Sequence, residues 1–115
     1  MNPIAPQIRM VFVPVSDLHK ARDWYCDVLG VPADGELVLN HLYFLPMQGP
    51  GLVLDSKIYS PDAVFQIPAV VLNTADIQAA HLYMKGKSAD VEDIQFDKWF
   101  NFKDPDGNLL MICQS

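Results

Sequence analysis

Residues 13–32 of the chain read VPVSDLHKARDWYCDVLGVP, and this stretch decides the fold. It opens with apolar and β-branched residues, which are typical of a buried strand. Ser16 or Asp17 then offers a side-chain oxygen that can cap the free N–H groups at the start of a helix. Apolar residues recur at helical spacing until Gly30 and Pro32 stop the helix. The stretch therefore predicts a strand that leads directly into an amphipathic helix.

The pattern of one strand, one helix and three further strands occurs twice along the chain. Asp17 coincides with Asp76 at an offset of 59 residues. Leu18 coincides with Ile77 at the same offset, so the apolar faces of the two predicted helices are in register. Such internal repetition indicates two copies of one structural unit. The predicted strands are residues 8–15, 36–39, 41–46 and 51–55 in the first unit, and 68–73, 91–96, 99–103 and 108–113 in the second.

We expect these two units to be modules of a single domain that covers residues 1–115. Half of the residues are hydrophobic and 19% are charged, which suits one packed core. The first module spans about residues 5–56 and the second about 64–115. The joint between them contains Ser60, Pro61 and Asp62, which favour an exposed connection.

Charge and composition exclude several classes of partner. The chain has 8 Lys and Arg against 14 Asp and Glu, a formal net charge of -6, so its surface repels nucleic acid. Its apolar runs are far shorter than the ~20 residues needed to span a bilayer. Its first residues lack the features of a signal peptide. We therefore expect a cytoplasmic protein with no membrane or nucleic-acid partner, in which Cys26 and Cys113 are reduced.

Two segments resemble the vicinal oxygen chelate superfamily, of the glyoxalase/bleomycin resistance protein type. One is residues 13–32, with the pattern D-L-x-x-A-x-x-[FW]-Y-x-x-x-L-G, and the other is FNFKDPDGNLLMI at residues 100–112. The resemblance implies an α+β fold in which two βαβββ modules form a curled mixed sheet, a cup with the helices outside. It also implies a homodimer, because the grooves of that family are often completed by a second chain.

The resemblance further implies where metal ligands would lie in this chain. The ligand of the first strand, usually His, falls on Met10 in the first module and on Ala69 in the second. The ligand of the last strand, usually Glu, falls on Met111 and on Leu54, and Asp55 would face inward only after a one-residue shift. These side chains lack the donors that divalent ions require. We therefore expect no metal and no other cofactor.

The alternation of side chains along strands predicts which residues line the cup. Trp99 and Asn101 share one face, whereas Phe100 and Phe102 point toward the helices. Trp99 either stacks on a ligand or fills a core or an interface. The other expected lining residues include Leu52, Leu54, Val71, Leu109 and Cys113. The candidate ligand-binding residues are Trp99, Asn101, Tyr43, His41, Met10, Phe12 and Met111.

The leading hypothesis is a metal-free small-molecule binding protein that sequesters or senses an apolar or cationic ligand. The net charge of -6 suits a cation. The alternative is a lyase or isomerase of the glyoxalase-like type that acts without the usual divalent metal and uses His41 or another side chain. A third possibility is an inert interaction domain with a filled cup. No residue is assigned as catalytic under the leading hypothesis.

Overall fold

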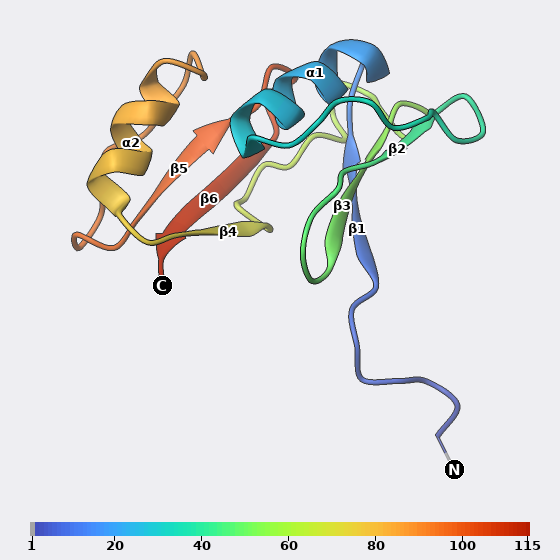
Figure 1. Cartoon of the computed structure of the whole chain (residues 1–115), viewed down its shortest axis with the longest axis horizontal. Coiled ribbons are helices and arrows are strands. Elements are labelled where there is room, and N and C mark those ends of the chain that lie inside the picture. The colour runs from blue at the N-terminus through green and yellow to red at the C-terminus, as the bar shows by residue number, and fades with distance from the viewer. Residues whose placement is uncertain (1) are drawn as a thin grey trace.

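The computed structural model describes residues 2–115 and has the repeated order of elements that the sequence predicts (Figure 1). Each module forms a three-stranded sheet of mixed direction, with strand orders β1-β3-β2 and β4-β6-β5. The expected α+β class is thereby confirmed. The first module contains β1 (Met10–Pro14), α1 (Leu18–Leu29), β2 (Leu42–Phe44) and β3 (Gly51–Asp55), and the second contains β4 (Val71–Thr74), α2 (Ile77–Lys85), β5 (Trp99–Lys103) and β6 (Leu109–Gln114).

The sequence correctly predicts how both helices begin. The Asp17 carboxylate accepts a hydrogen bond from the backbone N–H of Lys20 at 3.1 Å. Asp76 makes the equivalent bond to the N–H of Ala79, also at 3.1 Å. Helix α1 ends at Gly30, whose φ of 67° is the left-handed conformation that glycine adopts without strain. Neither helix described in residues 2–115 is long and apolar enough to cross a membrane.

One predicted strand in each module is reduced to isolated bridges. Residues 36–39 contribute a single bridge, between Val38 and Leu42, and residues 91–96 contribute bridges only at Val91 and Gln95. A tight turn overlaps the end of each segment. In each turn two successive residues other than glycine adopt a left-handed conformation, as in the turns that connect β-hairpins. They are Leu39 and Asn40 in the first module and Phe96 and Asp97 in the second.

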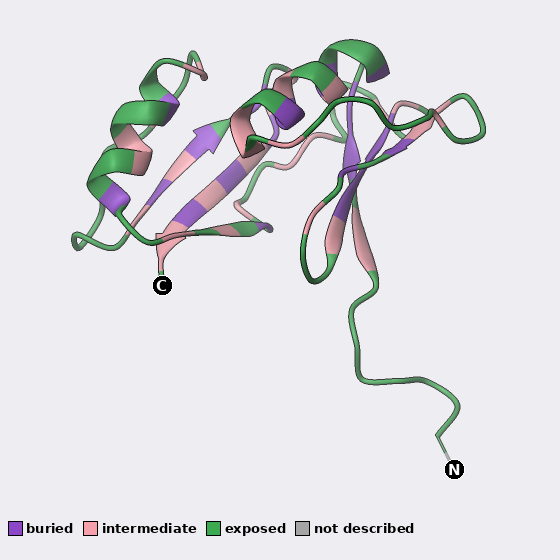
Figure 2. Ribbon diagram, in the orientation of Figure 1, coloured by how far each residue is buried: buried purple, intermediate pink, exposed green. Residues whose placement is uncertain are grey.

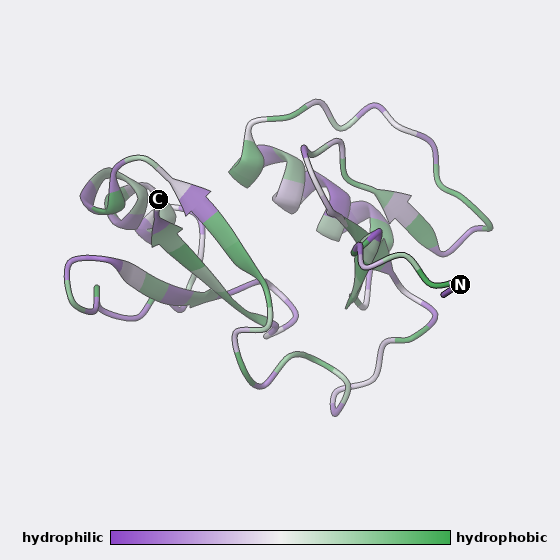
Figure 3. Cartoon of the chain, turned by 90° about the horizontal axis from the view of Figure 1, so that it is seen from below, coloured by the Kyte–Doolittle hydropathy of each residue, from purple (hydrophilic) through white to green (hydrophobic). Residues whose placement is uncertain are grey.

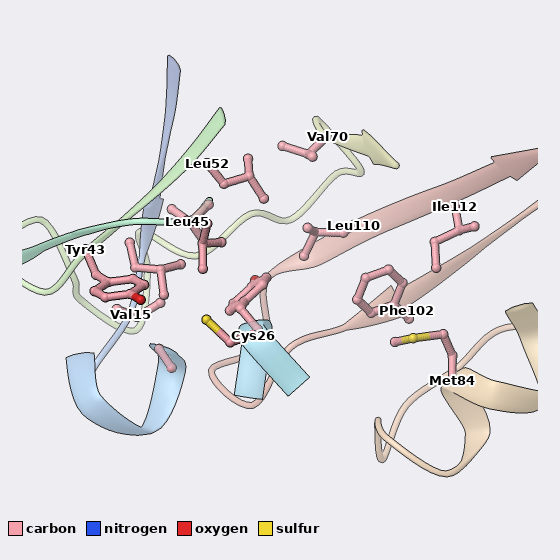
Figure 4. Packing of buried hydrophobic residues seen from close by; sticks show 14 of the residues in the cluster. Val15, Cys26, Tyr43, Leu45, Leu52, Val70, Met84, Phe102, Leu110 and Ile112 are labelled. Carbon is pink, nitrogen blue, oxygen red and sulfur yellow. The ribbon is translucent and has the colours of Figure 1, made fainter. Parts of the chain in front are cut away.

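The core lies between the helices and the sheets, and its buried side chains form one cluster that spans both modules (Figures 2 and 4). Helix α1 contributes Tyr25 and Cys26, and α2 contributes Met84. Phe100 and Phe102 meet them from β5 and are no more than 1% exposed. Fully burying one such side chain stabilises the fold by roughly 1.5–3 kcal/mol. The shared cluster therefore makes the two modules a single packed unit.

A buried polar network at the turn between β5 and β6 also joins the modules. The hydroxyl of Tyr25 donates a hydrogen bond to Asp104 Oδ2 at 2.6 Å. The side-chain amide of Asn108 donates to the same oxygen and to the carbonyl of Pro14, each at 2.8 Å. Asp104 Oδ1 accepts from the backbone N–H groups of Asp106 and Asn108, each at 2.9 Å. The turn of the second module thus binds both α1 and the end of β1.

The network makes the stability of the fold depend on pH. Burial, followed by the charge of Asp104, raises the pKa of Tyr25 well above its usual value of about 10. Above about pH 10 the unfolded chain therefore loses a proton that the folded chain keeps, so the free energy of unfolding falls as pH rises. The Tyr25→Phe variant removes this linkage and one of the four hydrogen bonds that the Asp104 carboxylate accepts, which we expect to cost about 1–3 kcal/mol at pH 7.

Urea unfolding between pH 7 and pH 11 tests this prediction. We expect Tyr25→Phe to be less stable than the native chain at pH 7 and to lose less stability at alkaline pH. Part of the alkaline loss remains, because burial also raises the pKa of Tyr43. Tyr59→Phe is the matched control and retains the native profile. An alkaline loss of native size in Tyr25→Phe would contradict the prediction.

Candidate ligand-binding site

The face of each sheet that is turned away from the helices, here called the open face, carries most of the candidate residues. On the second sheet Trp99 lies opposite Cys113 and Asn101 lies opposite Met111. Met111 is in turn beside Val71 on β4, and Val71 is 53% exposed. The intervening residues Phe100, Phe102, Leu110 and Ile112 are buried beneath the helices. The structure therefore places Trp99, Asn101 and Met111 together, as the alternation predicts.

The first sheet is shifted by one residue from the predicted arrangement. Phe12 lies beside Val53 in the parallel pair, and Phe44 lies opposite Val53 in the antiparallel pair. Met10, two residues before Phe12, shares this open face. The expectation that Leu52 and Leu54 line the cup is therefore wrong, because both point into the core; Figure 4 shows Leu52 there.

A difference in spacing between the modules explains the shift. Phe12 and Val71 are equivalent positions, yet Val53 follows Phe12 by 41 residues and Met111 follows Val71 by 40. The first module thus has one additional residue between its two paired strands. A shift of one residue turns every side chain of a strand to the opposite face. Asp55, two residues after Val53, consequently lies on the open face.

Tyr43 does not reach the open face, contrary to the predicted inward orientation. It lies opposite Leu54, is 1% exposed, and points into the core (Figure 4). Its hydroxyl accepts a hydrogen bond from the N–H of Gly35 at 3.2 Å. A Cβ atom at Gly35 would lie 3.0 Å from that hydroxyl, a tight contact, so the close approach favours glycine. Tyr43 is therefore part of the packing around α1.

His41 forms a pair with Asp55 that the sequence analysis missed. The Nδ1 atom of His41 lies 2.9 Å from Asp55 Oδ1, and the same oxygen accepts from the N–H of Lys57 at 2.9 Å. Asp55 is 5% exposed, whereas the His41 side chain is 25% exposed. The carboxylate fixes the imidazole ring and leaves its Nε2 atom toward the outside. Strand alternation places Asp55 on the open face only when β3 is aligned one residue later than the sequence analysis predicts, so the pair was missed.

Asn101 holds an unused hydrogen-bond acceptor on the second open face. Its Oδ1 atom is buried and has no hydrogen-bond partner within residues 2–115. Its Nδ2 atom donates to Glu92 Oε1 at 3.3 Å, which directs Oδ1 away from that carboxylate. A buried acceptor without a partner costs about 1–3 kcal/mol. Because the atom is covered within its own chain, a donor group of a ligand on the open face would reach it only after neighbouring side chains move.

The hollows on the single chain lie away from these residues. One of about 480 Å³ lies between the helices, lined by Val28, Tyr83 and Met84 among others. A second, of about 240 Å³, lies beside β4 and is lined by residues that include Pro50 and Val70. Neither includes Trp99, Asn101 or Met10 in its lining. Figure 3 shows hydrophobic stretches along the strands of both modules. The open faces are thus separate surfaces of one chain.

Comparison with known proteins places the chain in a family. The model of the Glyoxalase/Bleomycin resistance protein/Dioxygenase superfamily matches residues 7–112. The chain belongs to this superfamily. No curated protein matches the sequence.

Solved structures with the superfamily fold are similar over nearly the whole chain. TnmS3, an antibiotic binding protein from Streptomyces sp. CB03234, has 24% identity and a TM-score of 0.73, with 99% of this chain and 98% of that chain covered. A superfamily member from Sphaerobacter thermophilus DSM 20745 has 24% identity and a TM-score of 0.70, covering 97% and 98%. Lactoylglutathione lyase from Agrobacterium tumefaciens has 14% identity and a TM-score of 0.67, covering 97% and 96%.

The positions that the resemblance assigns to metal ligands do not fit a divalent ion. In the first module the corrected pair is Met10 and Val53, and in the second it is Ala69 and Met111. None of these four side chains has a nitrogen or oxygen donor. Among residues 2–115, His, Cys, Asp and Glu form no group of three or more that could hold an ion.

This donor set leads to a prediction about metal content. We expect purified protein, incubated with Mn²⁺, Fe²⁺, Ni²⁺ or Zn²⁺ and then desalted, to retain well below one equivalent of each ion by mass spectrometry. Thermal unfolding should be the same with and without EDTA, because no ion contributes to stability. One tightly held equivalent whose removal lowers the unfolding temperature would contradict this prediction.

Proposed function

We propose that this superfamily member is a metal-free binding protein that sequesters or senses an apolar or cationic small molecule. The observation that carries the proposal is the second open face, where Trp99 and the unpaired Oδ1 of Asn101 lie beside Met111. An indole ring offers a flat apolar surface for stacking, and a few polar atoms orient a ligand within such a site. Asn101 would accept a hydrogen bond from the ligand once the side chains that cover its Oδ1 atom move aside.

Charge favours a ligand with a donor or a positive group. Glu92 lies 3.3 Å from the Asn101 amide, so a carboxylate borders the unpaired acceptor. The chain as a whole has a net charge of -6, which raises the local concentration of cations. The antibiotic binding of TnmS3, a protein of the same fold, supports a small organic molecule as the ligand. The acidic charge also disfavours nucleic acid, and the free thiols of Cys26 and Cys113 favour a cytoplasmic location.

A homodimer is the second part of the proposal. The candidate residues lie on two separate sheets, Met10 and Phe12 on one and Trp99, Asn101 and Met111 on the other. Phe12, Phe44 and Val71 leave 45–53% of their surface exposed, and apolar patches of this kind mark interaction surfaces. A second chain can bring a first-module face opposite a second-module face. The ligand would then be enclosed between the two.

Tryptophan fluorescence tests the role of Trp99, since the chain has only two tryptophans. The indole of Trp24 donates to the Lys87 carbonyl at 2.9 Å, on the helix side of the fold. We therefore expect metal-free bleomycin, or the planar cation proflavine, to quench the Trp24→Phe variant, whose fluorescence comes from Trp99. The Trp99→Phe variant should show little quenching and bind at least about tenfold more weakly, a loss of about 1.4 kcal/mol.

The two variants are matched controls for each other, because each removes one indole. Asn101→Leu extends the test to the acceptor and should also weaken binding of either probe. Equal affinity in Trp99→Phe and in the native chain would contradict the stacking role. Failure of both probes to bind the native chain at millimolar concentration would contradict the proposed ligand class.

A lyase or isomerase that works without a metal is the second candidate function, and the His41–Asp55 pair favours it. A ring whose Nδ1–H is held by a carboxylate presents Nε2 as a proton acceptor. Such a group could remove a proton from a carbon next to a carbonyl, as isomerisation requires. The pair lies at the end of β3 that also carries Val53, so a ligand on the first open face would lie near it.

Turnover in the presence of EDTA distinguishes the two functions. With the hemithioacetal of methylglyoxal and glutathione as substrate, we expect the native chain and His41→Gln to show the same uncatalysed rate, because binding alone provides no proton transfer. Turnover that resists EDTA and disappears in His41→Gln would favour the enzyme. In that case the Asp55→Asn variant should retain about 1–10% of the rate, because Asp55 orients the His41 ring and does not touch the substrate.

A further inference from the structure

A hollow of about 480 Å³ lies on the helix side of the second sheet. Leu72 of β4 and Ile112 of β6 line it and are neighbours in the parallel pair, so they form its floor. Ala80 of α2 and Val28 of α1 line it from the two helices, which lie on the same side of the sheets (Figure 1). Because side chains alternate along a strand, Leu72 points to the side opposite Val71 and the open face. The hollow is therefore separate from the ligand site of the proposed function.

A set of polar contacts, here called the helix clasp (Asp27, Tyr83 and Lys87), joins the two helices at the rim of the hollow. The Tyr83 hydroxyl donates to the backbone carbonyls of Asp27 and Val28 at 3.1 and 3.0 Å. The Lys87 Nζ atom lies 3.0 Å from Asp27 Oδ2 and 5.4 Å from the centre of the Tyr83 ring. The clasp thus connects the last turn of α1 to α2 and to the residue that follows its C-cap. It sets the spacing between one helix of each module above the hollow.

The helix side chains around the hollow are small or flexible. At the offset of 59 residues that relates the modules, Met84 of α2 stands where α1 has Tyr25, and Ala80 stands where α1 has Ala21. Tyr25 and Met84 are each 1% exposed, so each packs beneath its own helix. A thioether chain is thinner than a phenol ring, and its three rotatable bonds let it fit the shape of a neighbour. Figure 4 shows Met84 reaching inward from α2 toward Phe102, so the lining can adjust to an occupant.

The apolar lining of the hollow favours an apolar occupant. Seven of its ten lining residues have aliphatic or thioether side chains. Atoms that face a gap lose the dispersion contacts that atoms of a packed interior make. Water held in such a gap finds few polar partners. Because the helix clasp holds the helices at this spacing, an apolar molecule that displaces the water gains contacts without requiring the helices to move.

Size and charge restrict the occupant to an uncharged small molecule. A stable protein interface takes about 20–30 residues from each side, at least about twice the number that line the hollow. Its volume lies within the ~300–1,000 Å³ typical of ligand sites. None of the lining residues described within residues 2–115 carries a charge, so an ion would lose its hydration without gaining a counter-charge. The Tyr83 oxygen, whose proton is already donated, can still accept a hydrogen bond from a ligand.

We propose that the hollow between α1 and α2 is a second ligand site, which binds an uncharged, mainly apolar molecule that carries one hydroxyl or amino donor. The apolar body lies against Leu72, Ala80 and Ile112, and the donor bonds to the Tyr83 oxygen. This site goes beyond the proposed function, whose ligand lies on the opposite side of the second sheet.

The neutral amine 1-aminoanthracene, whose fluorescence rises in apolar surroundings, tests the site with the full-length chain. We expect the native chain to bind it, and Ala80→Phe, which places a ring in the hollow, to raise its Kd at least about tenfold. Ala63→Phe is the matched control, because it makes the same change at an exposed alanine between the modules, and its Kd should stay within about twofold of the native value. Circular dichroism of both variants should be native. No binding to the native chain, or equal affinity in Ala80→Phe, overturns the proposal.

Methionine methyl spectra of the native chain locate the probe without any substitution. The chain has five methionines, of which Met84 lines the hollow, whereas Met10 and Met111 lie on the open faces. In a chain labelled with ¹³C at the methionine methyl groups, we expect 1-aminoanthracene to shift the Met84 signal and to leave those of Met10 and Met111 unchanged. A larger shift at Met10 or Met111 than at Met84 overturns the assignment to this hollow.

The probes of the open face separate failure of this proposal from failure of the proposed function. If bleomycin or proflavine quenches Trp99 and 1-aminoanthracene leaves Met84 unshifted, the second site is overturned and the proposed function stands. If Met84 shifts and neither of those probes binds the native chain, the second site stands and the proposed function is overturned. Loss of the Met84 shift on saturation with proflavine would indicate one shared site and overturn the second.

Discussion

The buried carboxylate of Asp104 is the constraint on which the rest of the structure depends. Within residues 2–115 the two sheets share no strand pairing, so other contacts must hold the modules together. Asp104 is 5% exposed, and a buried charge is tolerated only when its oxygens are hydrogen-bonded. Burial raises its pKa, and the bonds from Tyr25 and Asn108 oppose that shift. The DPDGN turn at residues 104–108 therefore connects the two modules through hydrogen bonds and also reverses the chain.

The hydrogen bonds of this turn also explain how the fold tolerates apolar side chains at the positions where metal-binding relatives have donor side chains. Asn108 ties the turn to the Pro14 carbonyl at 2.8 Å, and so fixes the end of β1 relative to β6. The open faces that carry Met10 and Met111 are the outer sides of these two strands. The polar network and the shared core fix their relative position. Substitution at the former ligand positions therefore changes the chemistry of the site more than the architecture.

The sequence predicts what local rules control and misses what depends on distant contacts. The Asp17 and Asp76 caps follow from short-range hydrogen bonds, and the face shared by Trp99 and Asn101 follows from alternation near a recognisable turn. The predicted alignment of β3 is off by one residue because the first module has one more residue between its paired strands than the second, and no regular pattern marks it. That alignment predicts that Asp55 points away from the cup. The bond between Tyr25 and Asp104 joins residues 79 positions apart, and no local pattern indicates it.

The unpaired oxygen of Asn101 distinguishes a ligand site from a mere interface. A second chain could cover Trp99, Met111 and Val71 with its own first-module face. The exposed apolar side chains of that face, Met10, Phe12 and Phe44, offer no hydrogen-bond donor to Asn101, and the one imidazole beside them, His41, is held by Asp55. Dimerisation on those apolar side chains alone would thus leave the acceptor unpaired and its cost unrelieved. A small molecule with an aromatic body and a donor group would relieve that cost and fill the space between the two faces. This difference in hydrogen bonding is the reason to propose a ligand between two chains and not an inert contact.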